Sequence, residues 1–130
     1  MTVFSEVADR VWVARYEWAD TNITAVGGER GLVVLDTHGS LSAGERVLDD
    51  LRGLAAGNVV AVINSHWHWD HTFGNAAFRQ LDASVPIHAH ENCAAALAEH
   101  GEEARERLAR EDPEHSEEVA ATTLVIPDQL

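Results

Sequence analysis

The segment that most constrains the fold of this 130-residue chain lies between Asn58 and His71, where an apolar run meets a cluster of polar side chains. The run NVVAVIN at 58–64 is far too short to span a bilayer, and its nearly continuous apolar character is typical of a strand covered on both faces. The polar segment 65–72 follows directly. We therefore expect a buried strand that ends at a polar cluster.

The residues before this strand predict a meander of antiparallel strands followed by a helix. Short β-like runs separated by turn signals lie at 10–15, 22–26 and 31–35. The apolar spacing then becomes helical, with Ser42 and Glu45 forming a capping-box pattern and Gly57 acting as the stop signal. This helix returns the chain to the buried strand.

The residues after the cluster continue the alternation of helix and strand. We expect a short helix over 75–81, a buried strand over 84–88, one or two helices over 91–110 broken near Gly101, and a strand-like end over 122–126. Strands followed by alternating helices and strands predict an α/β layered domain, a mixed sheet with flanking helices, over residues 1–130.

Charge and composition exclude several classes of partner. The formal net charge is −13, and all nine basic residues are arginines, so a nucleic acid would meet a repelling field. The start of the chain has no basic-then-apolar signal pattern, so we expect a cytoplasmic protein with no membrane partner. The single cysteine, Cys93, cannot form an internal disulfide and is expected to be a small buried hydrophobe.

The cluster His66-Trp67-His68-Trp69-Asp70-His71 predicts a metal site. In an extended segment, residues i and i+2 point the same way, so His66 and His68 can hold one cation together. Asp70 and His71 project to a neighbouring point from the first turn of the helix that follows. Imidazole nitrogens and carboxylate oxygens are ligands that zinc accepts, and a purely structural role gives no reason to place four such side chains here.

The stretch NSHWHWDH at 64–71 resembles the His-x-His-x-Asp-His signature of the metallo-β-lactamase superfamily, which also follows an apolar strand. TNITAVGGERGLVVLDTHGS is similar to the opening strands and the Asp-x-x-Gly loop of that family, and HTFGNAAF to the stretch after the signature. The resemblance implies a four-layer αββα sandwich. His66 and His68 would help to bind a first metal ion, and Asp70 and His71 a second.

The resemblance implies a dinuclear zinc hydrolase acting on an ester, thioester, lactone or lactam, with a small-molecule substrate. Asp70 would bind the second metal and orient the attacking hydroxide as the catalytic residue. Relatives complete the site with a later Gly-His-Ser/Thr motif, a bridging Asp and a final His, and none of these occurs before Leu130. His115 follows Glu114 and does not fit that pattern, so we expect residues 1–130 to be the N-terminal half of the domain, truncated before the later ligand motifs.

Two other functions stay open at this point. The first is a mononuclear iron (Fe²⁺) persulfide dioxygenase, which would use His66 and His68 with a later histidine. The second is a non-catalytic fragment that associates through its exposed half-core, as a homo-oligomer or with a C-terminal half.

Several residues outside the cluster are candidates for supporting roles. Asp36 is expected to orient a ligand histidine or to cap its loop, and His38 on the same loop is a candidate for contact with a metal ligand. Trp67 and Trp69 are expected either to line the site or to pack on neighbouring loops, and both alternatives stay open. His88 and His90 are expected to be ordinary hydrogen-bonded histidines.

Overall fold

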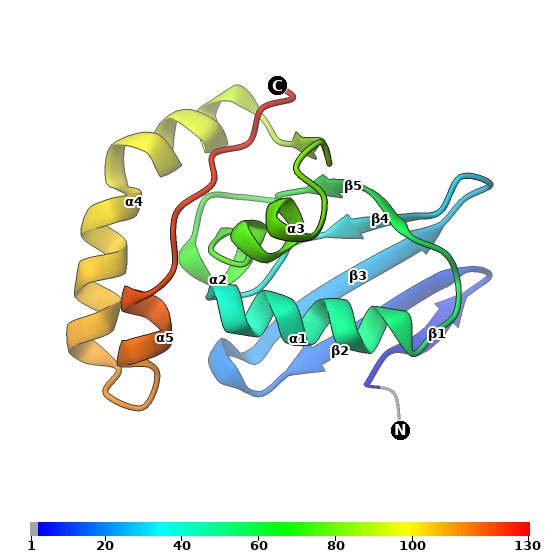
Figure 1. Cartoon of the computed structure of the whole chain (residues 1–130), viewed down its shortest axis with the longest axis horizontal. Helices are drawn as coiled ribbons and strands as arrows, with labels where there is room; N and C mark the ends of the chain where they lie inside the picture. The colour runs from blue at the N-terminus through cyan, green and yellow to red at the C-terminus, as the bar shows by residue number, and fades with distance from the viewer. Residues whose placement is uncertain (1–2) are drawn as a thin grey trace.

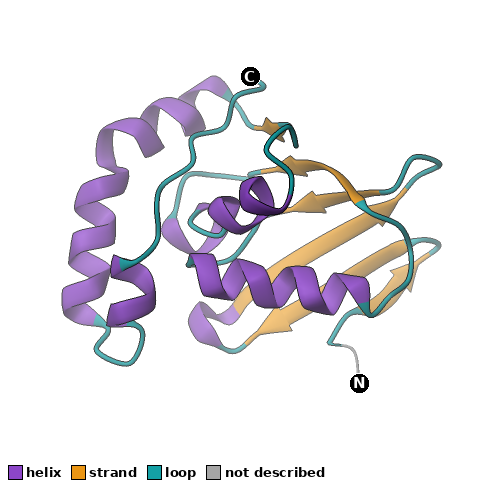
Figure 2. Cartoon of the chain, in the orientation of Figure 1, coloured by secondary structure: helices purple, strands orange, loops and turns teal. Residues whose placement is uncertain are grey.

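The structure, a computed structural model that describes residues 3–130, has one mixed six-stranded sheet with helices against it (Figures 1 and 2). The strands lie side by side in chain order: β1 (Ser5–Ala8), β2 (Val11–Tyr16), β3 (Thr21–Gly27), β4 (Leu32–Leu35), β5 (Val59–Ile63) and β6 (Ile87–His88). The helices are η1 (Trp18–Asp20), α1 (Leu41–Arg52), α2 (Trp69–Thr72), α3 (Asn75–Leu81), α4 (Glu91–Glu111) and α5 (Ser116–Ala120). The predicted α/β class, with a mixed sheet and flanking helices, is confirmed.

The pairing of the strands changes from antiparallel to parallel at β4. The first four strands form an antiparallel meander, of which β2, β3 and β4 were predicted, whereas β4 pairs with β5, and β5 with β6, in parallel. Parallel neighbours need a crossover, which α1 supplies between β4 and β5. The carboxyl ends of β4 and β5 therefore meet at the same edge of the sheet.

The core lies between one face of the sheet and the helices α1 and α3, which cover that face in Figure 1. Alternate side chains of β2, β3 and β4 point into it, as the two-residue period of a strand requires. The fully buried members are Ile23, Ala25, Leu32, Val34, Val62 and Ile87 from the sheet and Val47 from α1. Phe78 from α3 packs in the same cluster.

The opposite face of the sheet keeps apolar side chains at the surface. Val26 is 44% exposed, Leu35 36% and Ile63 38%. Leu35 and Ile63 are register partners on β4 and β5. The expectation that the strand 58–64 is covered on both faces is therefore wrong for this chain, because helices α1 and α3 form a layer on one face.

Helix α1 begins and ends earlier than the sequence pattern indicates. Its N-cap is Ser40, whose extended backbone lets the hydroxyl accept a hydrogen bond from the Ala43 amide at 3.0 Å, so the expected Ser42 cap is wrong. The helix ends at Arg52. Ala55 has a positive φ of 52° and so lies outside any helix, well before Gly57.

Helix α4 is a single helix that continues through Gly101. A Cβ at Gly101 would lie 2.7 Å from Leu124 Cδ1, so the glycine permits close packing and does not break the helix. The strand-like end at 122–126 belongs to no strand, and the only pairing beyond β6 among residues 3–130 is a bridge between His88 and Gln129.

The strand expected over 84–88 is reduced to the two residues of β6, and β1, η1 and α5 were not predicted. Cys93 is buried, as expected. Within residues 3–130, no helix combines the length and the apolar character needed to cross a membrane.

Candidate metal centre

The candidate site lies where β4 and β5 end side by side. Asp36 directly follows β4, and the signature begins three residues after β5. Two backbone hydrogen bonds join the segments: the Asp36 amide donates to the Ile63 carbonyl at 2.8 Å and the Thr37 amide to the His71 carbonyl at 3.1 Å. The parallel pairing thus brings the Asp36 loop onto the signature.

Asp36 is the buried anchor of this junction, with only 4% of its surface exposed. Its Oδ1 accepts from the Ser65 amide at 2.7 Å, and its Oδ2 accepts from the Ser65 hydroxyl at 2.7 Å. The same Oδ2 lies 2.8 Å from Nδ1 of His71. Asp36 therefore fixes one nitrogen of His71, the arrangement expected of a carboxylate that orients a ligand histidine.

The other nitrogen of His71 faces Asp70. Nε2 of His71 lies 3.1 Å from Oδ2 of Asp70. The hydrogen bonds to Asp36 and then to Asp70 raise the pKa of His71 to about 9. Without metal, His71 is therefore a cation held between two carboxylates at neutral pH.

Asp70 is ionised in the same setting. Burial acts to raise the pKa of its carboxyl, but the hydrogen bond and charge of His71, with a hydrogen bond from Thr21, hold it below the usual value. An ionised carboxylate is the form that binds a metal.

His66 and His68 lie on the exposed side of the signature. Their ring centroids are 4.8 Å apart, and the His66 ring is 4.1 Å from that of His71. Nδ1 of His66 lies 2.9 Å from the Ser65 hydroxyl. Burial, followed by the charges of His71 and His68, lowers the pKa of His66, which favours the neutral imidazole that metals bind.

The donor types of the signature fit a zinc-class cation, whereas the side chains are not arranged around a common point. Within the described part of the chain, no group of three or more His, Cys, Asp or Glu side chains is placed to hold one metal ion. One contact accounts for part of this, because Nε2 of His71 is engaged with Asp70. Metal binding through that nitrogen requires this contact to open.

A buried amide network supports the loop from behind, and the sequence analysis assigned it no role. Nδ2 of Asn64 donates to Oδ1 of Asn75 at 3.0 Å, and Nδ2 of Asn75 donates to Oδ1 of Asn64 at 2.8 Å. The Thr37 hydroxyl donates to Oδ1 of Asn75 at 2.8 Å. Both asparagines lie in the stretches that resemble the family, which is the signal that could have identified them.

The structure places His38 inside the protein, beside the site. Its side chain is 1% exposed, and its ring lies 5.0 Å from that of Tyr16 and 5.5 Å from that of Trp18. Nδ1 of His38 is buried without a hydrogen-bond partner among residues 3–130. Burial, followed by the charge of Arg46, lowers the pKa of His38 to about 4, so the ring is neutral.

His88, His90 and His115 make no ring contact with the signature residues, whereas the ring of His100 lies 5.7 Å from that of Trp67. His115 stacks on Trp18 with ring centroids 4.0 Å apart and pairs with Asp112 at 3.0 Å. His90 caps α4 by accepting from the Asn92 amide. His88 is exposed on β6.

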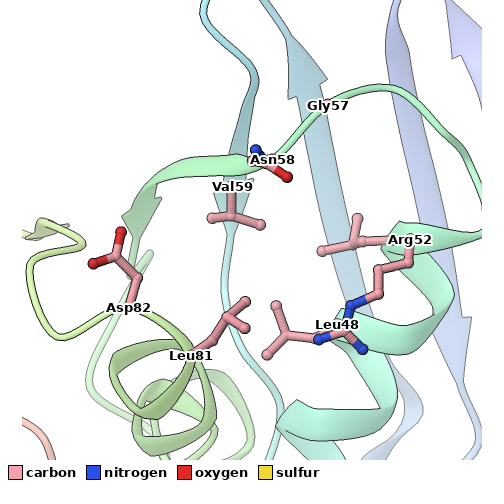
Figure 3. Close-up of a pocket in the computed structure, with 8 residues that line it drawn as sticks. Leu48, Arg52, Gly57, Asn58, Val59, Leu81 and Asp82 are labelled. Carbon is pink, nitrogen blue, oxygen red and sulfur yellow. The ribbon is translucent and has the colours of Figure 1, made fainter.

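Trp67 and Trp69 line a hollow of about 450 Å³ together with His68 and Asp70. The far wall is a face of α4, made of Ala104, Arg107, Leu108 and Glu111. A second cavity, of about 380 Å³, lies at the start of β5 and so at the opposite end of that strand (Figure 3). Leu48, Leu81 and Asp82 are among its lining residues, and no predicted site residue lines it.

Metallo-beta-lactamases are among the solved structures with the same fold. The enzyme from Erythrobacter litoralis, with beta-mercaptoethanol in its active site, has a TM-score of 0.63 at 23% identity, over 75% of this chain and 45% of that one. FIM-1 from Pseudomonas aeruginosa, in its mono-zinc form, has a TM-score of 0.61 at 17% identity, over 75% and 46%. A HARLDQ-motif mutant from Cronobacter sakazakii has a TM-score of 0.66 at 18% identity, over 78% and 39%.

The chain thus spans less than half the length of these structures. Comparison with curated proteins gives no match. The family model described as "Metallo-beta-lactamase superfamily" matches residues 16–128, which include the Asp36 loop and the whole signature. The chain therefore belongs to the metallo-beta-lactamase superfamily.

Proposed function

We propose that residues 1–130 supply the N-terminal half of a dinuclear zinc hydrolase that acts on an ester, thioester, lactone or lactam. The observation that carries the proposal is the position of His71, with Nδ1 2.8 Å from the buried Asp36 and Nε2 directed to the signature carboxylate. The contact with Asp36 orients the His71 ring as in a metal-ligating histidine, and Nε2 becomes available to a metal once its contact with Asp70 opens. His66 and His68 would hold the first ion, and Asp70 and His71 the second.

When bound, zinc supplies a Lewis acid that lowers the pKa of a coordinated water and polarises the scissile carbonyl. The protein groups have separate tasks. Asp36 accepts a hydrogen bond from Nδ1–H of His71, which keeps the proton on Nδ1 and leaves Nε2 as the ligand nitrogen. The Asp70 carboxylate stays ionised, and as the proposed catalytic residue it orients the attacking oxygen.

The hollow between the signature and α4 is the proposed substrate site. Its volume of about 450 Å³ lies within the range of small-molecule sites, which is about 300–1,000 Å³. Trp67 and Trp69 offer apolar walls beside the proposed ligands His68 and Asp70. A small-molecule substrate with an apolar portion suits such walls.

The proposed centre needs ligands from outside this segment. Two protein ligands for each ion are one fewer than a catalytic zinc usually has. Val26, Leu35 and Ile63 form an apolar surface on the uncovered sheet face that suits a second sheet. The proposed partner on this surface is a C-terminal half of the same fold. When that half is absent, a second copy of this chain is proposed to cover the surface.

Metal analysis of the purified chain tests the proposal. Chain equilibrated with equimolar Zn²⁺ and Fe²⁺ is expected to bind zinc, weakly because each ion lacks a third protein ligand, and to show little or no hydrolysis of a thioester, lactone or β-lactam. Retention of iron, with oxygen uptake on a persulfide, would instead support a dioxygenase. No retention of either metal, with the fold intact, would contradict the metal centre itself.

A further inference from the structure

A hydrogen bond from the start of β3 reaches the carboxylate of Asp70. Oγ1 of Thr21, the first residue of β3, donates to Oδ2 of Asp70 at 3.2 Å, across 49 positions of sequence. Thr21 is 1% exposed. Its hydroxyl is thus largely screened from water, which makes the hydrogen bond stronger than one at the surface.

The β2–β3 hairpin fixes the position of that hydroxyl. Thr21 pairs with Tyr16 at the end of the antiparallel ladder between the two strands. Tyr16 is itself tied to α1, because its hydroxyl donates to Oδ2 of Asp50 at 2.7 Å. The hydroxyl of Thr21 is therefore presented by the sheet, and groups on rigid elements position a site more accurately than groups on loops.

The turn between β2 and β3 also contacts the residue next to Asp70. The ring of Trp18, in η1, lies 5.2 Å from the ring of Trp69. Trp18 is anchored on its other side, where its Nε1 donates to Oδ2 of Asp112 at 2.9 Å and its ring stacks with His115. The hairpin thus contacts two consecutive residues of the signature.

Thr21 and His71 share one oxygen of Asp70. Nε2 of His71 lies 3.1 Å from Oδ2, the atom that also accepts from Thr21. His71 is needed elsewhere in the proposed centre, because Nε2 is the nitrogen that Asp36 leaves for a metal. Of these two donors, Thr21 is the one with no such competing task.

We propose that Thr21 is a positioning residue for Asp70, whose hydroxyl holds Oδ2 so that the carboxylate presents a fixed orientation to the second metal. The inference rests on the proposed function, since it needs Asp70 to be a ligand. Thr21 acts through Asp70 and touches neither metal nor substrate.

Titration of the purified 130-residue chain with Co²⁺ alone tests this role, because the visible absorption of Co²⁺ reports the ligands and geometry of its site. The variants are Thr21→Val, which keeps the shape and removes the donor, Thr21→Ser, which restores a donor, and Asp70→Ala. Thr24→Val is the matched control, because Thr24 lies on the same strand and points to the opposite face. Urea unfolding of each metal-free variant measures any loss of stability separately.

Thr21→Val is expected to weaken Co²⁺ binding about tenfold and to change the visible spectrum, as loss of a group that orients a ligand does. Thr21→Ser should restore most of both, and Thr24→Val should match the unchanged chain. Asp70→Ala should weaken binding more than Thr21→Val does.

Two results overturn the inference alone and leave the proposed function standing, provided that Asp70→Ala loses metal. One is an unchanged affinity and spectrum in Thr21→Val. The other is an equal loss in Thr21→Val and Thr21→Ser that tracks their loss of stability. If the unchanged chain binds no Co²⁺, or Asp70→Ala binds it as well as the unchanged chain, both proposals are wrong.

Discussion

Nδ1 of His71 lies 2.8 Å from Oδ2 of the buried Asp36, and this contact joins the loop after β4 to helix α2, which follows the parallel strand β5. It makes His71 a cation in the metal-free chain, with a pKa of about 9. Because the same carboxylate also accepts twice from Ser65, it connects the stability of the junction to the orientation of a proposed ligand.

Asp36→Asn should destabilise the chain strongly. The substitution keeps the size of the side chain but places an amide donor among the Ser65 and His71 donors, so a buried group loses its partner. We expect a loss of about 3 kcal/mol in the free energy of unfolding, measured in urea at pH 7. Asp49→Asn is the control, because that carboxylate pairs with Arg52 at the surface, and it should change little. Equal small losses in both variants would contradict the role of Asp36.

Gly74→Ala should disrupt the site through the backbone. A Cβ at Gly74 would lie 1.8 Å from the Thr37 carbonyl oxygen, and the loop can relieve this clash only by moving. We expect a loss of about 3 kcal/mol or more, with reduced metal binding. Gly28→Ala is the matched control, since the nearest atom to its Cβ would be 3.9 Å away. Thermal unfolding of both variants measures the difference.

Acid should destabilise the chain through His38. Its folded pKa of about 4 lies below the ordinary value of 6.5, so the unfolded chain binds a proton first as the pH falls. The contribution of the neutral ring is complete above pH 6.5 and is lost on the way to pH 4, by about 3 kcal/mol in total. The charged and titratable groups that act on it are Arg46, Asp70, Glu118 and His115.

His38→Asn tests this dependence, because asparagine tolerates the positive φ of 79° at this position and does not titrate. The free energy of unfolding of the variant should fall less steeply than that of the unchanged chain between pH 6.5 and pH 4. If the two curves of unfolding free energy against pH were parallel, the lowered pKa of His38 would be contradicted.

The uncovered sheet face should make the isolated chain associate. Replacing both Leu35 and Ile63 by glutamate places charges on two paired, exposed positions. Light scattering should then give the 14.2 kDa monomer, whereas the unchanged chain gives a larger mass at the same concentration. Leu81→Glu is the control, because Leu81 is exposed on the helical side. If the unchanged chain were a monomer at this concentration, the proposed interface would be contradicted.

The sequence predicts the elements whose pattern is local and long enough to read. β2, β3, β4, β5 and α3 were each expected from a local run of residues, and their positions agree with the structure to within one or two residues. Ser40 and Ser42 lie two residues apart, and backbone conformation decides which of them caps α1. Residues 122–126 have strand-like composition but no neighbouring strand to pair with.

The candidate site also contains residues that the sequence predicts and contacts that it does not. The spacing of the four signature residues identifies them as candidate ligands, because adjacent residues in a loop share one location. Asp36 was also predicted to orient a ligand histidine or to cap its loop. The contacts of Asn75 with Thr37, 38 positions apart, and of Thr21 with Asp70, 49 positions apart, depend on the pairing of distant strands. Periodicity in one sequence carries no information on such pairs.

The central claim is that the signature binds metal, and elemental analysis of purified variants tests it most directly. His68→Ala and Asp70→Ala should each contain much less bound zinc than the unchanged chain, because each loses a ligand and its affinity for zinc falls by more than about tenfold. His115→Ala should retain the zinc of the unchanged chain, because His115 stacks on Trp18 and pairs with Asp112, away from the signature. Equal zinc loss from all three variants, or from none, would contradict the assignment.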